Sequence, residues 1–217
     1  MSKRAIIVYG GYSGHTPKEC SLFMKELLDR EGFEIDLCDS LDCFSDEERM
    51  SNYDLIIPNW TDGELTGDQW NVFDRIVRTG IGVGGWHGGM ADGFRANYNF
   101  HFMVRGKFVC HPGNQKLYTV NISETTDPIV ADLKDFQVHS EQYYVHFDPI
   151  IDILATTTIC KPVGDYPWAE GVEIPVVWKK SWGKGRVFNC SIRHGVSDFA
   201  VPEVRNIIIR GLQWAAR

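Results

Sequence analysis

The stretch GVGGWHGG (residues 82–89) places a single histidine, His87, among five glycines. It continues a short apolar run, and we predict a strand over residues 81–87 that ends in a sharp turn. Glycine costs backbone entropy, so a cluster of it indicates a tight turn or a close approach of the backbone to another group. Residues 85–89 also fit the Gly-x-residue-x-Gly spacing of a nucleophile elbow, a strand-to-helix turn that exposes one side chain. The stretch therefore predicts a strand end that presents His87.

Strands and helices alternate through the first 90 residues around this stretch. Short apolar, β-rich runs predict strands over residues 4–10, 33–38, 53–59 and 81–87. Helical spacing predicts a helix from Pro17 to a stop at Gly32, a short acidic helix capped by Ser45, and a helix opened by Thr66. This alternation is typical of βα units, so we predict an α/β fold with a mostly parallel central sheet.

The second half of the chain is less regular. Predicted strands cover residues 106–113, 116–124, 152–159, 173–182 and 183–192. Residues 181–185 read as a hairpin turn between the last two strands, Asp127-Pro128 as the start of a short helix, and residues 202–217 as a closing amphipathic helix. No repeat, low-complexity segment or linker interrupts the pattern, so residues 1–217 are predicted to form one domain.

Composition and charge exclude several classes of partner. The formal net charge is -7 and no block of lysine and arginine stands out, which argues against nucleic acid. No stretch approaches the roughly 18 apolar residues of a membrane span, and the first apolar run is too short for a signal peptide. We therefore expect a cytoplasmic protein whose six scattered cysteines are buried thiols. The sequence leaves open whether copies of the chain form a homo-oligomer.

Polar and aromatic side chains gather at one predicted edge of the sheet. Ligands of open parallel sheets bind at the carboxyl ends of the strands, which selects the loops that hold His15, Trp60 and Trp86 beside His87. Tryptophan faces suit stacking on the apolar face of a sugar ring, and Trp168 is expected to line the same cleft. The loop at His15 lacks the lysine of a phosphate-binding loop, which favours a turn.

Four segments resemble the ThuA-like (trehalose utilisation) family. They are GGWHGG at residues 84–89, KFVCHPGNQ at 107–115, HSEQYYVHFDP at 139–149 and PVVWKKSWGKGRVFNCSIRHG at 175–195. The resemblance implies the class I glutamine amidotransferase-like fold, a flavodoxin-like three-layer sandwich, and adds His111, Glu141, Tyr143 and His194 to the candidate site. One departure is Ser140, where the family often carries an aspartate before the glutamate.

The elbow lacks the cysteine nucleophile of the glutamine amidotransferases. His87 takes its place, so glutamine hydrolysis is disfavoured, and Cys110 and Cys190 are predicted to be core thiols. Imidazole is a general acid or base and the commonest zinc ligand. His87, Glu141 and His194 are therefore predicted as catalytic residues or as ligands of a divalent metal, zinc first among them. His15, Trp60, Trp86, His111, Tyr143 and Trp168 are predicted to contact the substrate.

Two hypotheses of function remain open at this stage. The first is an enzyme of carbohydrate metabolism that acts on a sugar, a glycoside or a keto-sugar by metal-assisted or His/Glu acid–base chemistry; the link to trehalose is implied by the family resemblance. The second is a non-catalytic sugar-binding or assembly protein on an amidotransferase-like scaffold, because fold alone does not fix function.

Overall fold

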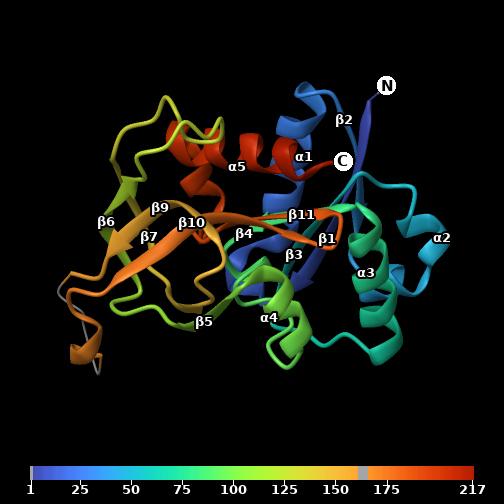
Figure 1. Ribbon diagram of the computed structural model, residues 1–217, viewed down its shortest axis with the longest axis horizontal. Helices are drawn as coiled ribbons and strands as arrows, with labels where there is room; N and C mark the ends of the chain where they lie inside the picture. The colour runs from blue at the N-terminus through green and yellow to red at the C-terminus, as the bar shows by residue number, and fades with distance from the viewer. Residues whose placement is uncertain (1, 161–165) are drawn as a thin grey trace.

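A computed structural model describes residues 2–160 and 166–217 as an α/β fold around one large sheet (Figure 1). Nine strands lie in the order β2-β1-β3-β4-β11-β10-β9-β6-β7, and β5 pairs with β8 in a separate two-stranded sheet. The strands are β1 (Lys3–Gly11), β2 (Phe33–Cys38), β3 (Leu55–Thr61), β4 (Gly82–Trp86), β5 (Gly106–Cys110), β6 (Gln115–Ile122), β7 (Phe136–Glu141), β8 (Tyr144–Phe147), β9 (Asp152–Thr158), β10 (Glu173–Trp182) and β11 (Gly185–Cys190). The α-helices are α1 (Pro17–Arg30), α2 (Glu47–Met50), α3 (Gly67–Thr79), α4 (Tyr98–Val104) and α5 (Pro202–Ala215).

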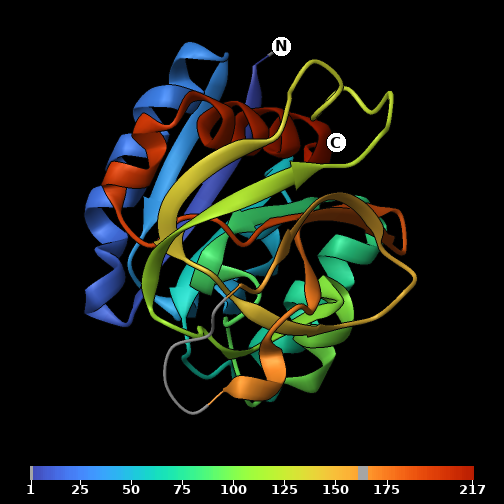
Figure 2. The same ribbon diagram turned by 90° about the vertical axis from the view of Figure 1, so that its left-hand side faces the viewer.

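The first five strands of this order, β2 to β11, run parallel and form the middle layer of a three-layer sandwich. Side chains alternate across β1: Ala5 and Ile7 join a core with α1 and α5, whereas Ile6 and Val8 join a second core with α3. The helices accordingly cover both faces of the sheet, with α1 and α5 on one side and α3 and α4 on the other (Figures 1 and 2). Burial on both faces explains the almost continuous apolar runs in these strands, and it confirms the predicted fold class.

Local signals start the long helices where the sequence predicts. Pro17 and Pro202 lie in the first turns of α1 and α5. Thr66 and Gln69 form a reciprocal capping box at the start of α3. The predicted cap of the short acidic helix is wrong by one residue, because Asp46 rather than Ser45 accepts a hydrogen bond from the backbone of Arg49, at 2.9 Å.

The remaining four strands of the large sheet are antiparallel. In this part of the chain the sequence predicted only some of the helices and strands. The hairpin of β10 and β11 lies as expected, with Trp182 paired to Gly185. Residues 127–131 form hydrogen-bonded turns rather than the predicted helix. The sequence analysis did not predict α4, β7 or β8, and the predicted strand at residues 106–113 corresponds to β5 in the small sheet.

The sheet curls strongly across its antiparallel part. Five strand spacings of about 4.8 Å would separate β7 from β4 by about 24 Å in a flat sheet. Glu141 at the end of β7 nevertheless contacts His87 just after β4, at 3.1 Å. The pairing of β6 with β9 covers only two residue pairs, Asn121 with Thr156 and Ile122 with Ala155. This short ladder lets the last two strands turn back over the ends of the parallel strands.

No helix in the described part of the chain is long and apolar enough to cross a membrane.

Candidate functional site

His87 occupies a sharp turn at the end of β4. Trp86 is extended, whereas His87 has a φ of 47° in the left-handed region and begins a short 3-10 helix, η3 (His87–Gly89). That conformation costs a residue other than glycine about 1–2 kcal/mol, so surrounding contacts must hold it. The predicted elbow is therefore present. Its side chain is fully buried within a cluster of polar groups, however, and is not exposed as the elbow pattern predicts.

The two glycines after His87 allow β3 to approach the turn. A Cβ atom on Gly88 would lie 2.2 Å from the hydroxyl of Thr61, and one on Gly89 would lie 2.2 Å from the carbonyl oxygen of Pro58. Neither position has room for a side chain. The glycines of this stretch thus serve close backbone packing, and that packing fixes where His87 lies.

Three histidine side chains from distant parts of the sequence converge around the carboxylate of Glu141. Its Oε2 lies 3.1 Å from Nε2 of His87 and 3.9 Å from Nε2 of His15, and its Oε1 lies 3.1 Å from Nδ1 of His194. The four potential ligand atoms all lie within 4.8 Å of one another. The structure thus brings together the three predicted metal ligands and adds His15, which we had predicted to contact the substrate. We call these four residues the histidine cluster.

Hydrogen bonding sets the tautomer of His87. Its Nδ1 lies 3.1 Å from the carbonyl oxygen of Ser191, and a carbonyl oxygen only accepts, so Nδ1 carries a proton and donates. In a neutral ring Nε2 is then an unprotonated acceptor, and it faces another acceptor, the carboxylate of Glu141. Two acceptors at 3.1 Å repel unless a proton or a cation lies between them. The buried Nδ1 of His194 also lacks a well-formed hydrogen bond despite its proximity to Glu141.

Burial favours neutral imidazoles beside an ionised carboxylate. Burial lowers the pKa of His15 to about 3, with a further contribution from the neighbouring His87. Burial likewise lowers the pKa of His87. For Glu141 burial raises the pKa, but its contacts with His87 and His194 outweigh that effect and lower the pKa to about 2. Near neutral pH Glu141 therefore carries a negative charge beside the neutral imidazoles of His15 and His87, which suits a cation.

The donor set fits a zinc ion. Imidazole nitrogen and carboxylate oxygen are the ligands of many catalytic zinc sites, with bonds of about 2.1 Å. Tetrahedral ligands at that bond length lie about 3.4 Å apart, close to the separations of 3.1 and 3.9 Å measured from the carboxylate of Glu141. Supporting contacts on the far side of two rings are also present, from Ser191 to His87 and from Thr61 to His15, at 3.1 and 2.7 Å.

A buried aspartate, Asp198, accepts hydrogen bonds from residues on both sides of the site. Oδ2 of Asp198 accepts hydrogen bonds from the hydroxyl of Ser140 and from the backbone N–H of His194, both at 2.6 Å. Ser140 precedes Glu141 in β7, whereas His194 follows β11. An acidic group therefore does support the site despite the serine at position 140, and it comes from another segment.

A buried arginine lies behind the cluster. The guanidinium of Arg193 donates to the backbone carbonyl of His15 at 3.1 Å and lies over the rings of Trp86 and Phe199. Its positive charge contributes to the low pKa of both His15 and His87.

The histidine cluster opens on one side into a cleft of about 450 Å³, the histidine cleft. Among the described residues, it is lined by Tyr12, His15, Thr61, Asp62, Asp92, Arg95, Phe108, His111, Asn114, Glu141 and Tyr143. His111 and Tyr143 therefore lie where the sequence predicts. The ring of Tyr143 stacks on His87, with centroids 4.1 Å apart, and closes the cluster on that side.

The three tryptophans predicted to contact the substrate are not among these lining residues. Trp86 is fully buried and packs edge-on against Phe199, within the core that α1 and α5 cover. The ring of Trp60 lies against the backbone of Gly10, Gly11 and Gly63. Trp168 is 58% exposed and contacts Tyr144 and Tyr166.

Cys110 and Cys190, predicted to be core thiols, are buried. The prediction that every cysteine is buried is wrong for Cys38, which is half-buried, and for Cys160, which is exposed. Burial raises the pKa of Cys190 to about 12, and it also raises the pKa of Cys110. The nucleophilic form of cysteine is the thiolate, so neither thiol is an activated nucleophile near neutral pH.

Sequence reasoning missed several charged residues of the site. Asp92 and Arg95 form a bidentate ion pair, at 2.6 and 2.7 Å, in the wall of the histidine cleft. Asp198 supports the histidine cluster through its hydrogen bonds with Ser140 and His194. The only available signal for Asp92 and Arg95 was their position shortly after the elbow glycines. Asp198 lies in a 3-10 helix, η5 (Val196–Ala200), that no sequence pattern marked.

Comparisons with known proteins agree with the fold and show the family of the chain. A family model described as trehalose utilisation (ThuA) matches residues 4–215. A ThuA-like protein from Bacteroides uniformis ATCC 8492 is 18% identical, with a TM-score of 0.78 over 97% of this chain and 89% of that chain. One from Parabacteroides merdae ATCC 43184 is 17% identical, with a TM-score of 0.79 over 99% and 90% of the two chains. A cytoplasmic protein from Salmonella typhimurium LT2 is 11% identical, with a TM-score of 0.70 over 99% and 100%. The comparison with curated proteins gives no match.

Proposed function

This chain belongs to the ThuA (trehalose utilisation) family, and from that premise we propose that it is an enzyme of carbohydrate metabolism. Its substrate is a sugar, a glycoside or a keto-sugar bound in the histidine cleft. The reaction is a proton transfer or a hydrolysis that uses metal-assisted or His/Glu acid–base chemistry and no thiol nucleophile. The family supports a role in sugar metabolism, and the chemistry rests on the site.

One observation carries the proposal. An ionised carboxylate, that of Glu141, is surrounded by three imidazoles, and the ring nitrogen of His87 facing it is an unprotonated acceptor. A purely structural cluster would pair donors with acceptors, because an unpaired buried polar group costs about 1–3 kcal/mol. An arrangement that leaves acceptors face to face is typical of a site that holds a cation or a proton used in a reaction.

His15, His87, Glu141 and His194 would hold the metal, with zinc favoured by the donor set. When bound, such a cation polarises a carbonyl or hydroxyl oxygen of the substrate as a Lewis acid. The protein's own part is to keep the imidazoles neutral by burial and to orient two of them through Ser191 and Thr61.

The walls of the histidine cleft supply the groups that would bind and protonate the sugar. Arg95 is held by Asp92, and its side chain is 51% exposed, so it can donate to sugar hydroxyls. His111 lies outside the histidine cluster and lines the cleft beside Phe108. We assign His111 the proton transfer to or from the substrate, since imidazole is a common general acid or base and this ring faces the cleft.

We also propose a cytoplasmic location, which the similar Salmonella protein described as cytoplasmic supports.

The test is turnover of zinc-loaded protein in deuterated water. α,α-Trehalose and an oxidised, 3-keto derivative are followed by NMR for deuterium uptake at carbon and for release of a monosaccharide. We expect one of these changes with the wild-type protein, and its loss in Glu141→Gln and His111→Gln. His139→Gln is the matched control, because His139 is an exposed histidine on the same strand as Glu141.

Sugar binding without either change would contradict the proposal and favour a non-catalytic sugar-binding protein. Turnover that survives Glu141→Gln unaltered would place the chemistry elsewhere in the molecule.

A further inference from the structure

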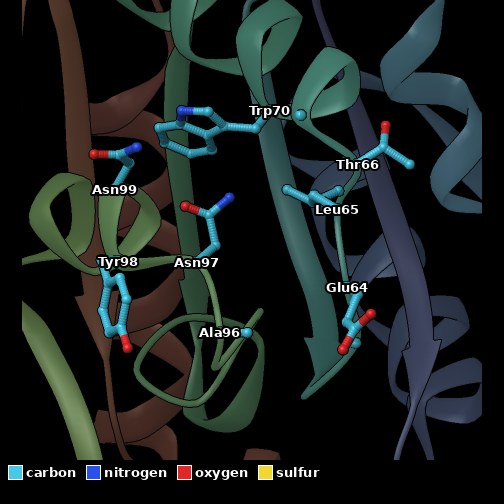
Figure 3. A pocket seen from close by; sticks show the side chains of 10 residues that line it. Glu64, Leu65, Thr66, Trp70, Ala96, Asn97, Tyr98 and Asn99 are labelled. Atoms are coloured by element: carbon cyan, nitrogen blue, oxygen red, sulfur yellow. The ribbon is translucent and has the colours of Figure 1, made fainter.

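A second cavity lies beside the histidine cleft. This outer groove has a volume of about 530 Å³, within the range of small-molecule sites. Residues 63–67, between β3 and the start of α3, line one side, and residues 96–99 at the start of α4 line the other. Figure 3 shows Asn97, Tyr98 and Asn99 facing Glu64, Leu65 and Thr66 across the groove, with Trp70 of α3 at one end.

The side chains of the outer groove suit a neutral, hydroxyl-rich ligand. Tyr98 is 72% exposed, and it also lines a neighbouring cavity with Lys107, whose ammonium group lies 5.5 Å from the centroid of its ring. Glu64 offers carboxylate oxygens and Asn99 an amide donor and acceptor. Asn97 offers its amide NH₂ group, because its Oδ1 caps α4 by accepting from the backbone N–H of Phe100 at 3.1 Å. The described lining residues include no lysine or arginine, so the groove lacks the cations that recognise phosphate or carboxylate groups.

The outer groove and the histidine cleft are built from the same two segments. Thr61 and Asp62 line the cleft, and the residues directly after them line the groove. In the second segment Asp92 and Arg95 line the cleft, and residues 96–99 line the groove.

Hydrogen bonds and an ion pair join the two segments at the boundary between the histidine cleft and the outer groove. The backbone of Asp62 bonds to Asp92 and Phe94, at 2.9 and 2.8 Å, and its carboxylate lies 3.8 Å from Arg95. The side chains of Asp62 and Arg95 are both more than half exposed, so they remain available to a ligand that crosses the boundary.

We infer that the outer groove binds the second sugar ring of a disaccharide or glycoside whose first ring lies in the histidine cleft. The inference rests on the proposed function, because it assumes a sugar at the histidine cluster. Tyr98 supplies the stacking face, and Glu64 with the two asparagines supplies hydrogen bonds to the hydroxyl groups. The groove therefore sets the preference for a two-ring over a one-ring ligand.

The test compares two probes, methyl α-D-glucopyranoside and α,α-trehalose, by calorimetric titration of the zinc-loaded protein. We expect Tyr98→Ala to weaken trehalose binding by about fivefold to tenfold, the size of one aromatic contact. The affinity for the methyl glucoside stays within about twofold of the wild type. Glu64→Gln is a second variant with the same expected direction. Phe102→Ala is the matched control, since Phe102 is a second exposed aromatic residue of α4, 54% exposed, outside the groove.

The outcomes separate this inference from the proposed function. If Glu141→Gln weakens both probes while Tyr98→Ala and Glu64→Gln leave the trehalose affinity unchanged, the groove is no sugar subsite and the proposed function stands. If neither probe binds the wild-type protein, both are wrong. If Phe102→Ala weakens trehalose binding as much as Tyr98→Ala does, the effect belongs to α4 as a whole and the assignment to the groove fails.

Discussion

The parallel and antiparallel parts of the large sheet contribute to the site in different ways. The parallel part supplies rigid strand ends: β1 leads to His15, β4 to His87 and β11 to His194, all at one edge. The antiparallel part supplies Glu141 from its outermost strand, β7, which reaches the same place only because the sheet curls. The first part is a scaffold shared by many α/β proteins. The second part supplies the carboxylate around which the three histidines gather.

If zinc binding needs both parts of the sheet, removing a ligand residue from either part should greatly weaken it. We expect Glu141→Gln and His87→Gln each to weaken zinc binding by more than about 100-fold, since losing even a supporting contact costs about 10- to 100-fold. Competition with a chromogenic chelator measures the affinities, with His139→Gln as the control. An unchanged affinity in either variant would show that one part of the sheet is dispensable.

Asp198 tests the connection between the two parts. Asp198→Ala removes the acceptor shared by Ser140 and His194, so we expect zinc affinity to fall by about 10- to 100-fold. The free energy of unfolding should fall by about 1–3 kcal/mol, because two buried donors lose their partner. Asp198→Asn keeps one carbonyl acceptor and should recover part of both losses. Wild-type zinc affinity in the alanine variant would mean that the two parts hold their positions independently.

The tight backbone packing of the elbow belongs to the parallel part alone. Gly89→Ala would press a methyl group against the carbonyl oxygen of Pro58, and we expect a loss of about 1–3 kcal/mol in the free energy of unfolding. Gly67→Ala at the start of α3 is the control, because a Cβ there meets no atom within 4 Å. Denaturant titration measures both. Equal stabilities of the two variants would contradict the packing explanation for the glycines.

Protonation of His15 should appear in the pH dependence of stability. Its pKa is about 3 in the folded protein and ordinarily 6.5, so only the unfolded chain takes up this proton as the pH falls below about 6.5. The folded state of chelator-treated protein therefore loses stability on acidification, with a slope approaching about 1.4 kcal/mol per pH unit for one proton. Glu141 acts in the same direction at lower pH, since its folded pKa of about 2 lies below its ordinary 4.5.

His15→Gln removes one of these protons, so its stability should depend less steeply on pH than that of the wild type between pH 6 and 4.5. Denaturant titrations at several pH values measure the slopes. Parallel curves for the two proteins would contradict a neutral His15.

The sequence allowed predictions where a local pattern of residues also indicates their position in the fold. Alternating strands and helices define the parallel part, and the rule that ligands bind at strand ends selected His15 and His87. Trp86, the last residue of β4, packs into the core beside α1 and α5, whereas the chain turns sharply at His87. Thr66 marked the start of α3 since a capping box is a local signal.

The remaining features depend on long-range geometry. Glu141 was selected by family resemblance alone, because its contact with His87 requires the curl between β9 and β6. The role of Asp198 depends on η5 packing against β7, which leaves no periodic pattern. The position of Trp60 follows from glycine backbones that leave room for its ring, a feature visible only in three dimensions.

The central claim is that the two parts of the sheet meet around a metal. Anomalous diffraction from a zinc-soaked crystal at the zinc absorption edge tests it most directly. We predict one strong peak, about 2.0–2.2 Å from the ligand atoms of His15, His87, Glu141 and His194. No peak at this site, or a peak that persists unchanged in Glu141→Gln, would contradict the account.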